Sequence, residues 1–303
     1  MLRVIPSSSK LVLKALSNST RLAILALLKK SPMSVSKIAR TLGITQPTAT
    51  AYVKMLEKTG LVFHRMQQYP SGYQKVCFTN YDGVELSWEE APTVNQAVEY
   101  TLDMPVGHYC AIECGTPSLL ASAVGIIASS EDTSHFLSPP RMEATLLVLG
   151  NGVVRYLFPY NIPASRRLVG LELSTEVGLA FGHGAGETAL TASVNDRRLG
   201  VVAVGRGRPH LPVSPACSWW PKGLGGGGER LVWRLTADGV EMSAGQCEPL
   251  SLGDLGLSPM RPIEVAFTVE CRSSKPNSVA FFGHDFGWFN QDIRLRLECA
   301  ADE

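Results

Sequence analysis

The segment QPTATAYVK, residues 46–54, gathers small uncharged side chains of the kind that hydrogen-bond to the edges of bases. On a helix over residues 46–59, positions 49, 53 and 56 would share an apolar stripe that packs on neighbouring helices. A second stripe, Pro47, Thr50, Ala51 and Lys54, would carry short side chains and one lysine. The major groove of B-DNA accepts such a helix, and Gln46 or Thr48 at its tip could reach base edges. The segment therefore predicts a helix that binds DNA.

Charge is divided unequally along the chain. Residues 1–80 contain 12 lysines or arginines and a single acid, Glu57, which gives a formal charge of +11. The remaining residues hold 16 basic and 26 acidic side chains, a charge of −10. This asymmetry indicates a polyanion-binding N-terminal part joined to a different kind of domain. The predicted contacts to DNA phosphates are Arg21, Lys37, Arg40, Lys54, Lys58, Arg65 and Lys75.

Aromatic and polar residues in the C-terminal half could bind a small molecule. Flat apolar rings beside amides and carboxylates suit a sugar-like or aromatic compound. Core packing and turns at strand ends are the alternative interpretation, which the sequence leaves open. The candidate effector-binding residues are Trp219, Trp220, His284, Asp285, Trp288, Asn290 and Gln291.

Catalytic and metal-binding patterns are weaker. On a strand, His108, Cys110 and Cys114 would share one face and could bind zinc, but no fourth ligand is evident and buried structural cysteines are favoured. The glycine-rich stretch 223–229 lacks the Lys-Ser/Thr ending of a phosphate-binding loop, and His183 has no convincing partner. Glu172, Asp285 and Asp292 cannot be paired from sequence. We therefore predict no catalytic residue, no metal and no cofactor, and expect a protein that is not an enzyme.

Three helices must position the polar segment. Thr20 is predicted to cap the first helix, which Ser31 and Pro32 end. A second helix is expected to start at Ser34 and to end at Gly43. The third starts at Thr45 or Gln46, and Gly60 ends it. The turn at Gly43 produces helix-turn-helix spacing, and two strands, 61–65 and 73–78, would form a hairpin around a turn at 66–72.

Beyond residue 95 the chain changes to short alternating or β-branched segments separated by turns. Ile293, Leu295 and Leu297 alternate with charged residues, as on a strand with one wet face. The pattern predicts an α+β multidomain protein: a winged helix-turn-helix domain over residues 1–86 and an antiparallel, jelly-roll-like β-sandwich over residues 95–303.

The segments LKALSNSTRLAILALLKK and MSVSKIARTLGITQPTATAYVKMLEKTGLV resemble the winged helix of ArsR-type bacterial transcriptional regulators. The resemblance covers residues 10–80 and implies dimers that bind palindromic operators, with residues 2–16 as a pairing element. It also implies DNA-facing positions at Gln46, Thr48, Thr50, Ala51 and Tyr52. The helix before the turn reads SVSKIAR, without the Cys-x-Cys pair of metal-sensing members, so metal sensing is not expected.

The C-terminal part is similar, less specifically, to a β-sandwich region that follows this winged helix in predicted bacterial regulators. That likeness implies sensing or oligomerisation. The chain has no apolar run of about 18 residues and no signal segment, so we expect a cytoplasmic protein without membrane contact. The leading hypothesis is a dimeric, sequence-specific regulator with an effector-binding β domain. The alternative is a carbohydrate-active enzyme or binding protein that carries a winged-helix docking module.

Overall fold

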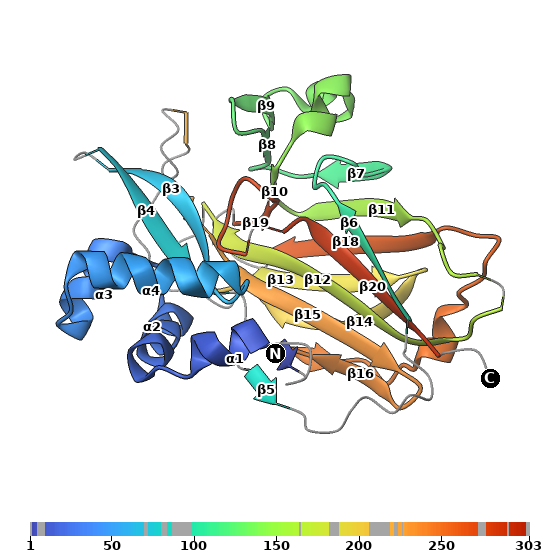
Figure 1. Cartoon of the computed structure of the whole chain (residues 1–303). Helices are drawn as coiled ribbons and strands as arrows, with labels where there is room; N and C mark the ends of the chain where they lie inside the picture. The colour runs from blue at the N-terminus through green and yellow to red at the C-terminus, as the bar shows by residue number, and fades with distance from the viewer. Residues whose placement is uncertain are drawn as a thin grey trace. The chain divides into compact units, whose positions relative to one another are not determined.

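The computed structural model divides the chain into two units, Met1–Val94 (unit 1) and Asn95–Glu303 (unit 2). The structure describes residues 2–4, 10–69, 72–79, 84–86, 98–163, 165–181, 188–205, 219–220, 224–225, 227–271, 277–289 and 291–300. Unit 1 is built mainly of helices and unit 2 of strands (Figure 1). The predicted α+β architecture of two parts is confirmed.

In the described part of unit 1 there are four helices: α1 (Lys10–Leu16), α2 (Ser19–Lys30), α3 (Val35–Leu42) and α4 (Gln46–Lys58). Asn18 caps α2, because its side chain accepts a hydrogen bond from the backbone of Arg21. The prediction that Thr20 is the cap was therefore wrong by two residues. Residues at helical spacing, including Ile24, Ile38 and Leu56, are fully buried in one core.

The junction between α3 and α4 follows the predicted turn. The hydroxyl of Ser34 caps α3 and that of Thr45 caps α4. Between the two helices Gly43 has φ +65°, a left-handed conformation that glycine adopts at little cost. The chain thus reverses within three residues, as a helix-turn-helix requires.

A three-stranded sheet completes the compact part of unit 1, in the order β2 (Met33–Ser34), β4 (Gly72–Phe78) and β3 (Phe63–Tyr69). The β3–β4 hairpin is longer than predicted, since pairing continues from Phe63↔Phe78 to Tyr69↔Gly72. The predicted turn at 66–72 was therefore too long, because it includes residues that belong to the two strands. The short strands β1 (Leu2–Val4) and β5 (Val84–Leu86) pair in parallel. Within the predicted pairing element, residues 2–16, the structure describes the strand β1 and the helix α1.

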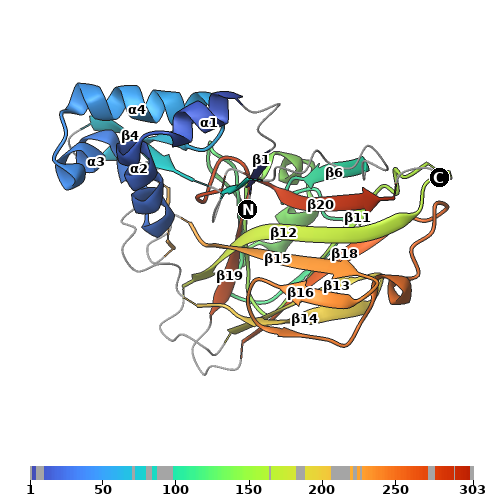
Figure 2. The same ribbon diagram turned by 60° about the horizontal axis from the view of Figure 1, so that its bottom comes forward.

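The described residues of unit 2 form two antiparallel sheets, seen as adjacent layers in Figures 1 and 2. The nine-stranded sheet comprises β6 (Val98–Met104), β8 (Leu119–Ala121), β9 (Ile126–Ser129), β10 (Leu146–Leu149), β12 (Leu168–Ala180), β15 (Glu229–Thr236), β16 (Gly239–Met242), β19 (Ser278–Phe282) and β20 (Ile293–Cys299). The six-stranded sheet comprises β7 (Ala111–Cys114), β11 (Gly152–Phe158), β13 (Thr188–Val194), β14 (Arg197–Ala203), β17 (Gln246–Cys247) and β18 (Ile263–Cys271). The connections that the structure describes include the short 3₁₀ helices η1 (Thr133–Leu137), η2 (Pro139–Glu143) and η3 (Leu252–Leu255).

The two sheets share one apolar core. On β20 the alternating residues Ile293, Leu295 and Leu297 are fully buried, as the sequence pattern predicts. Rings from both sheets meet there, with Phe267 of β18 lying 6.1 Å from Trp233 and 5.3 Å from Phe281 between ring centroids. Burial of these large side chains supplies the main drive for folding of unit 2.

Strand β12 organises the nine-stranded sheet. One of its edges pairs with β15, while its other edge pairs first with β20 and then with β19. Its outer face is also covered, and residues Gly170–Ala180 are all buried. A second apolar cluster, which includes Phe282, Trp220 and Phe286, lies on this side of the sheet.

Among the residues that the structure describes, no single helix has both the length and the apolar composition of a membrane span. Helices α1 and α2 meet that test only when they are taken together, and they are bent by 88° relative to each other.

Candidate nucleic-acid interface

Helix α4 is anchored by its inner stripe. Ala49, Val53 and Leu56 are each at most 1% exposed, and the last two belong to the core of unit 1. At the N-terminus, the Thr45 hydroxyl accepts the backbone N–H of Thr48 at 3.3 Å and lies 2.8 Å from the Thr48 hydroxyl. The helix is therefore held by its buried stripe, and its first turn by the cap at Thr45.

The opposite stripe faces outward. Gln46, Pro47, Ala51 and Lys54 are exposed, and together with Thr50 they line a shallow hollow on the surface of unit 1. The Thr50 hydroxyl donates to the carbonyl of Gln46 at 2.9 Å, so its oxygen can still accept a hydrogen bond. The stripe offers an amide, a hydroxyl and a methyl group, the side chains that pair with base edges in the major groove.

Two predicted DNA contacts are engaged within unit 1. The guanidinium of Arg21 donates to the carbonyls of Ala15 and Lys14, at 2.6 Å each, and so satisfies the C-terminal end of α1. The same guanidinium lies 5.6 Å from the ring centroid of Tyr52, which packs against the helical core. Arg21 and Tyr52 therefore stabilise the domain from within, and neither belongs to the outward stripe.

Lys75 is the third predicted contact that has an internal partner. Its ammonium group lies 2.7 Å from a carboxylate oxygen of Glu57, whose carboxylate also contacts His64 at 2.8 Å. Sequence reasoning missed this role of Glu57, although its position as the single acid among the first 80 residues was a signal. The pair ties the end of α4 to the hairpin.

Four predicted phosphate contacts remain exposed: Lys37, Arg40, Lys54 and Lys58. Within the described part of the chain, none of their charged groups has an ion-pair or hydrogen-bond partner. Lys37 and Arg40 lie on α3, and the other two lie on α4. The side chain of the seventh predicted contact, Arg65, lies outside the described residues. The helix-turn-helix thus carries free positive charge on both of its helices.

Comparison with known families finds a match within unit 1. The match falls on residues 16–65, from the end of α1 to the start of the hairpin, and the family is described as a helix-turn-helix domain. Residues 16–65 form a helix-turn-helix domain. The likeness to winged helix-turn-helix proteins inferred from sequence is thereby confirmed for this part of the chain.

Some solved structures are similar to parts of this chain. A homodimeric winged helix-turn-helix DNA-binding domain from Mycobacterium bovis, described as a possible ArsR-family transcriptional regulator, is 33% identical, with 24% of this chain and 64% of that chain covered and a TM-score of 0.22. The chain therefore spans less than two thirds of that domain.

Two further structures share 8% and 12% identity with the chain. They are the mosquito-larvicidal Cry4Aa toxin from Bacillus thuringiensis (79% and 29% of the two chains, TM-score 0.29) and the cellulose-induced protein Cip1 (60% and 87%, TM-score 0.28). Neither likeness assigns an activity to unit 2. No protein with a curated description matches the chain.

The predicted effector residues of unit 2 are packed differently from one another. Trp219, Trp220 and Phe286 form an aromatic cluster with centroid distances of 5.2–6.0 Å. Trp220 is buried, and its indole N–H donates to the carbonyl of Leu224 at 2.9 Å. This packing favours the alternative interpretation of Trp219 and Trp220, in which they are core residues and do not bind a small molecule.

The second group of candidates forms a tightly bonded turn. The buried carboxylate of Glu176 accepts the backbone N–H groups of Gly228, Trp288 and Phe289 at 2.7–2.9 Å. Gln291 is buried and donates to the hydroxyl of Ser174 at 3.0 Å. Sequence reasoning missed Glu176, which lies more than 100 residues before the turn that it holds. Asn290 lies outside the described residues.

His284 and Asp285 remain at the surface of that turn, each about half exposed. The His284 ring lies 2.9 Å from a carboxylate oxygen of Asp292 and 3.5 Å from one of Asp285. Asp292 also accepts the backbone N–H of His284, so the three side chains close the turn on itself.

No cluster of three metal-ligating side chains occurs among the described residues. His108 lies 3.1 Å from the carbonyl of Met142, while the Cys110 thiol donates to the carbonyl of Arg155. Burial raises the pKa of the Cys114 thiol, which disfavours the thiolate that a metal needs. The structure thus gives His108 and Cys110 separate backbone partners.

Glu172, a carboxylate that sequence alone could not pair, sits among arginines on the outer face of β12. It accepts two hydrogen bonds from Arg234, at 2.6 and 3.1 Å, and lies within 4.0 Å of Arg230 and Arg296. Burial acts to raise its pKa, but the hydrogen bond from Arg234 and the three positive charges outweigh burial and hold that pKa below its ordinary value. Glu172 therefore stays ionised and acts as a structural anion.

Proposed function

We propose that this chain is a dimeric, sequence-specific DNA-binding transcriptional regulator. The observation that carries the proposal is the outward stripe of α4, a surface of short hydrogen-bonding side chains that also carries Lys54. The same helix-turn-helix carries three further exposed cations, and none of the four has an internal partner among the described residues. Gln46, Thr48, Thr50 and Ala51 would contact base edges, and the four cations would contact phosphates. The helix-turn-helix match supports the same assignment.

The proposal extends to unit 2 as a sensing domain. A ligand that prefers one arrangement of the dimer would shift the population of dimers and change the spacing of the two α4 helices. No catalysis is assigned to unit 2 in this proposal. Such a regulator acts in the compartment that holds its operator.

Binding of the full chain to the DNA upstream of its own gene tests the proposal. Four phosphate contacts in each protomer correspond to a slope of about −7 for the logarithm of affinity against the logarithm of salt concentration in a dimer. Fluorescence anisotropy from 50 to 400 mM salt, roughly the range where such slopes are measurable, should give this slope on one inverted sequence. Shallow binding that ignores sequence would refute the proposal, and sedimentation of the complex would show whether two protomers bind.

A further inference from the structure

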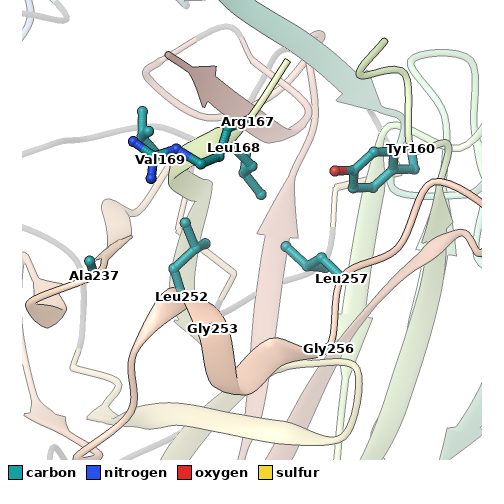
Figure 3. Close-up of a pocket in the computed structure, with 9 residues that line it drawn as sticks. All are labelled: Tyr160, Arg167, Leu168, Val169, Ala237, Leu252, Gly253, Gly256 and Leu257. Carbon is teal, nitrogen blue, oxygen red and sulfur yellow. The ribbon is translucent and has the colours of Figure 1, made fainter. Parts of the chain in front are cut away.

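A hollow of about 380 Å³ lies in unit 2 between the first residues of β12 and η3 (Figure 3). Its apolar walls are supplied mainly by Leu168, Leu252 and Leu257, whose side chains are half-buried. The close-up shows Leu168 between two polar side chains, Tyr160 on one side and Arg167 on the other. None of these residues is among the effector candidates predicted from sequence.

The η3 turn that forms one wall is rigidly built. The carboxylate of Asp254 accepts both the backbone N–H of Ser251, at 2.8 Å, and its hydroxyl, at 2.6 Å. Leu255 is buried in the main core, and Gly256 ends the turn with φ +58°. Leu252 and Leu257, on either side of this anchored residue, are left facing the hollow. A wall held in this way needs little ordering when a ligand binds.

The two polar groups at the hollow have hydrogen-bonding capacity that the described residues leave unused. Within the residues described for unit 2, neither the guanidinium of Arg167 nor the hydroxyl of Tyr160 has a hydrogen-bond or ion-pair partner. The Arg167 backbone is fixed, because its carbonyl accepts the N–H of Ala300 at 2.8 Å. Burial, and then the nearby Cys299, raise the pKa of Tyr160, so its hydroxyl stays protonated and can donate.

We propose that this hollow binds a small carboxylic acid with an aliphatic body. The guanidinium of Arg167 would bind the carboxylate through two parallel hydrogen bonds, and the three leucines would cover the hydrocarbon. Aliphatic walls of this kind favour an alkyl chain over a sugar, which stacks on aromatic rings. Binding is a property of unit 2 alone. A role for the acid as effector rests on the regulatory function proposed above.

Octanoate and octan-1-ol are suitable probes, because they share a chain length and differ in charge. Calorimetric titration of the full chain, without DNA, should show saturable binding of one octanoate per chain and binding of octanol at least about tenfold weaker. Arg167→Met keeps the length of an exposed side chain and removes its charge, and should weaken octanoate binding by about tenfold or more. Arg261→Met, a change at an exposed arginine that does not line the hollow, is the matched control and should bind octanoate as the unchanged protein does.

A second variant adds bulk at the hollow. A Cβ at Gly253, which lines it, would meet only the Ser251 hydroxyl, at 3.9 Å, so Gly253→Leu is compatible with the fold and should block both probes. Equal affinities for octanoate and octanol, unchanged binding by Arg167→Met, or no saturable binding of octanoate would each overturn the proposal. These titrations contain no DNA, so a negative result leaves the DNA-binding proposal standing. Conversely, a failure of the chain to bind DNA would not change its measured affinities for octanoate and octanol.

Discussion

Thr50 illustrates how one side chain can serve both a helix and a partner. Its hydroxyl donates to the carbonyl of Gln46 one turn earlier, which fixes the direction of the oxygen lone pairs. A fixed acceptor is suited to a donor on a base edge, because little side-chain entropy is lost on binding. Gln46 itself is exposed and adds both a donor and an acceptor.

Replacement of Gln46 and Thr50 by alanine should remove preference for the operator and leave the salt dependence nearly unchanged. Each lost base contact should cost about 1–3 kcal/mol at its own position. Anisotropy titrations with operator and scrambled DNA measure both quantities. A collapse of the salt slope would mean that these residues contact phosphates instead.

Cys77 is expected to resist alkylation in the folded protein. Burial raises the pKa of its thiol from 9.0 to about 12, while Lys75 lowers it and Glu57 raises it by smaller amounts. At pH 8 almost no thiolate forms, so iodoacetamide should modify the exposed Cys110 and Cys247 first. Mass spectrometry of peptides at timed intervals checks the order, and rapid labelling of Cys77 would contradict its burial.

The same thiol makes stability depend on pH. In the unfolded chain it ionises near 9.0, and in the folded chain only near 12, so the folded state binds the proton more tightly. Its contribution is therefore complete below pH 9 and is lost as pH rises toward 12. Urea unfolding at pH 8 and at pH 10.5, the latter about one and a half units above the ordinary pKa of a thiol, measures this loss. From the lower to the higher pH, the free energy of unfolding should fall by less in Cys77→Ala than in the unchanged protein.

At the scale of elements, unit 2 depends on the contact between β12 and the turn 284–289. Glu176 is fully buried and supplies the acceptor for three backbone N–H groups, one of them buried and two partly buried. Backbone donors buried without acceptors are costly, so this single side chain determines whether the turn can close against the sheet.

Glu176→Ala should lower the free energy of unfolding of unit 2 by about 3 kcal/mol, since it removes the acceptor of three backbone N–H groups that are wholly or partly buried. Glu264→Ala is the control. It breaks a partly exposed pair with Arg155 (2.8 Å) on the other sheet and should cost less than about 1 kcal/mol. Urea unfolding followed by tryptophan fluorescence measures both, and similar losses for the two variants would show that Glu176 does not hold the turn.

At the scale of the whole molecule, a net charge of +1 conceals two parts of opposite sign. Long-range attraction to DNA depends on where the charges lie, because salt screens interactions beyond about 8–10 Å. The helix-turn-helix can therefore attract a polyanion although the complete chain is almost neutral.

Two double variants separate position from total charge. Lys54→Gln with Lys58→Gln removes two charges from α4, whereas Arg197→Gln with Arg261→Gln removes two from exposed sites in unit 2. The first should reduce the salt slope by about 2 for each protomer, and the second should leave it unchanged. Equal effects in the anisotropy assay would indicate that overall charge governs binding.

Local patterns in the sequence determined much of this protein. Helical spacing, the caps at Ser34 and Thr45 and the glycine at 43 predict the helix-turn-helix, because each acts within a few residues. Alternation along residues 293–299 likewise predicts a strand with one buried face. The outward stripe of α4 follows from helical geometry alone.

Only the tertiary structure decided which polar groups are already in use. Arg21 and Lys75 have the same charge in the sequence as Lys54, but neighbouring elements supply partners for the first two and leave the third exposed. The hollow beside Arg167 likewise exists because β12 and η3, distant in sequence, meet in the fold. Hydrogen bonding and burial depend on what a fold brings within a few ångströms, and residue spacing along the chain does not encode those distances directly.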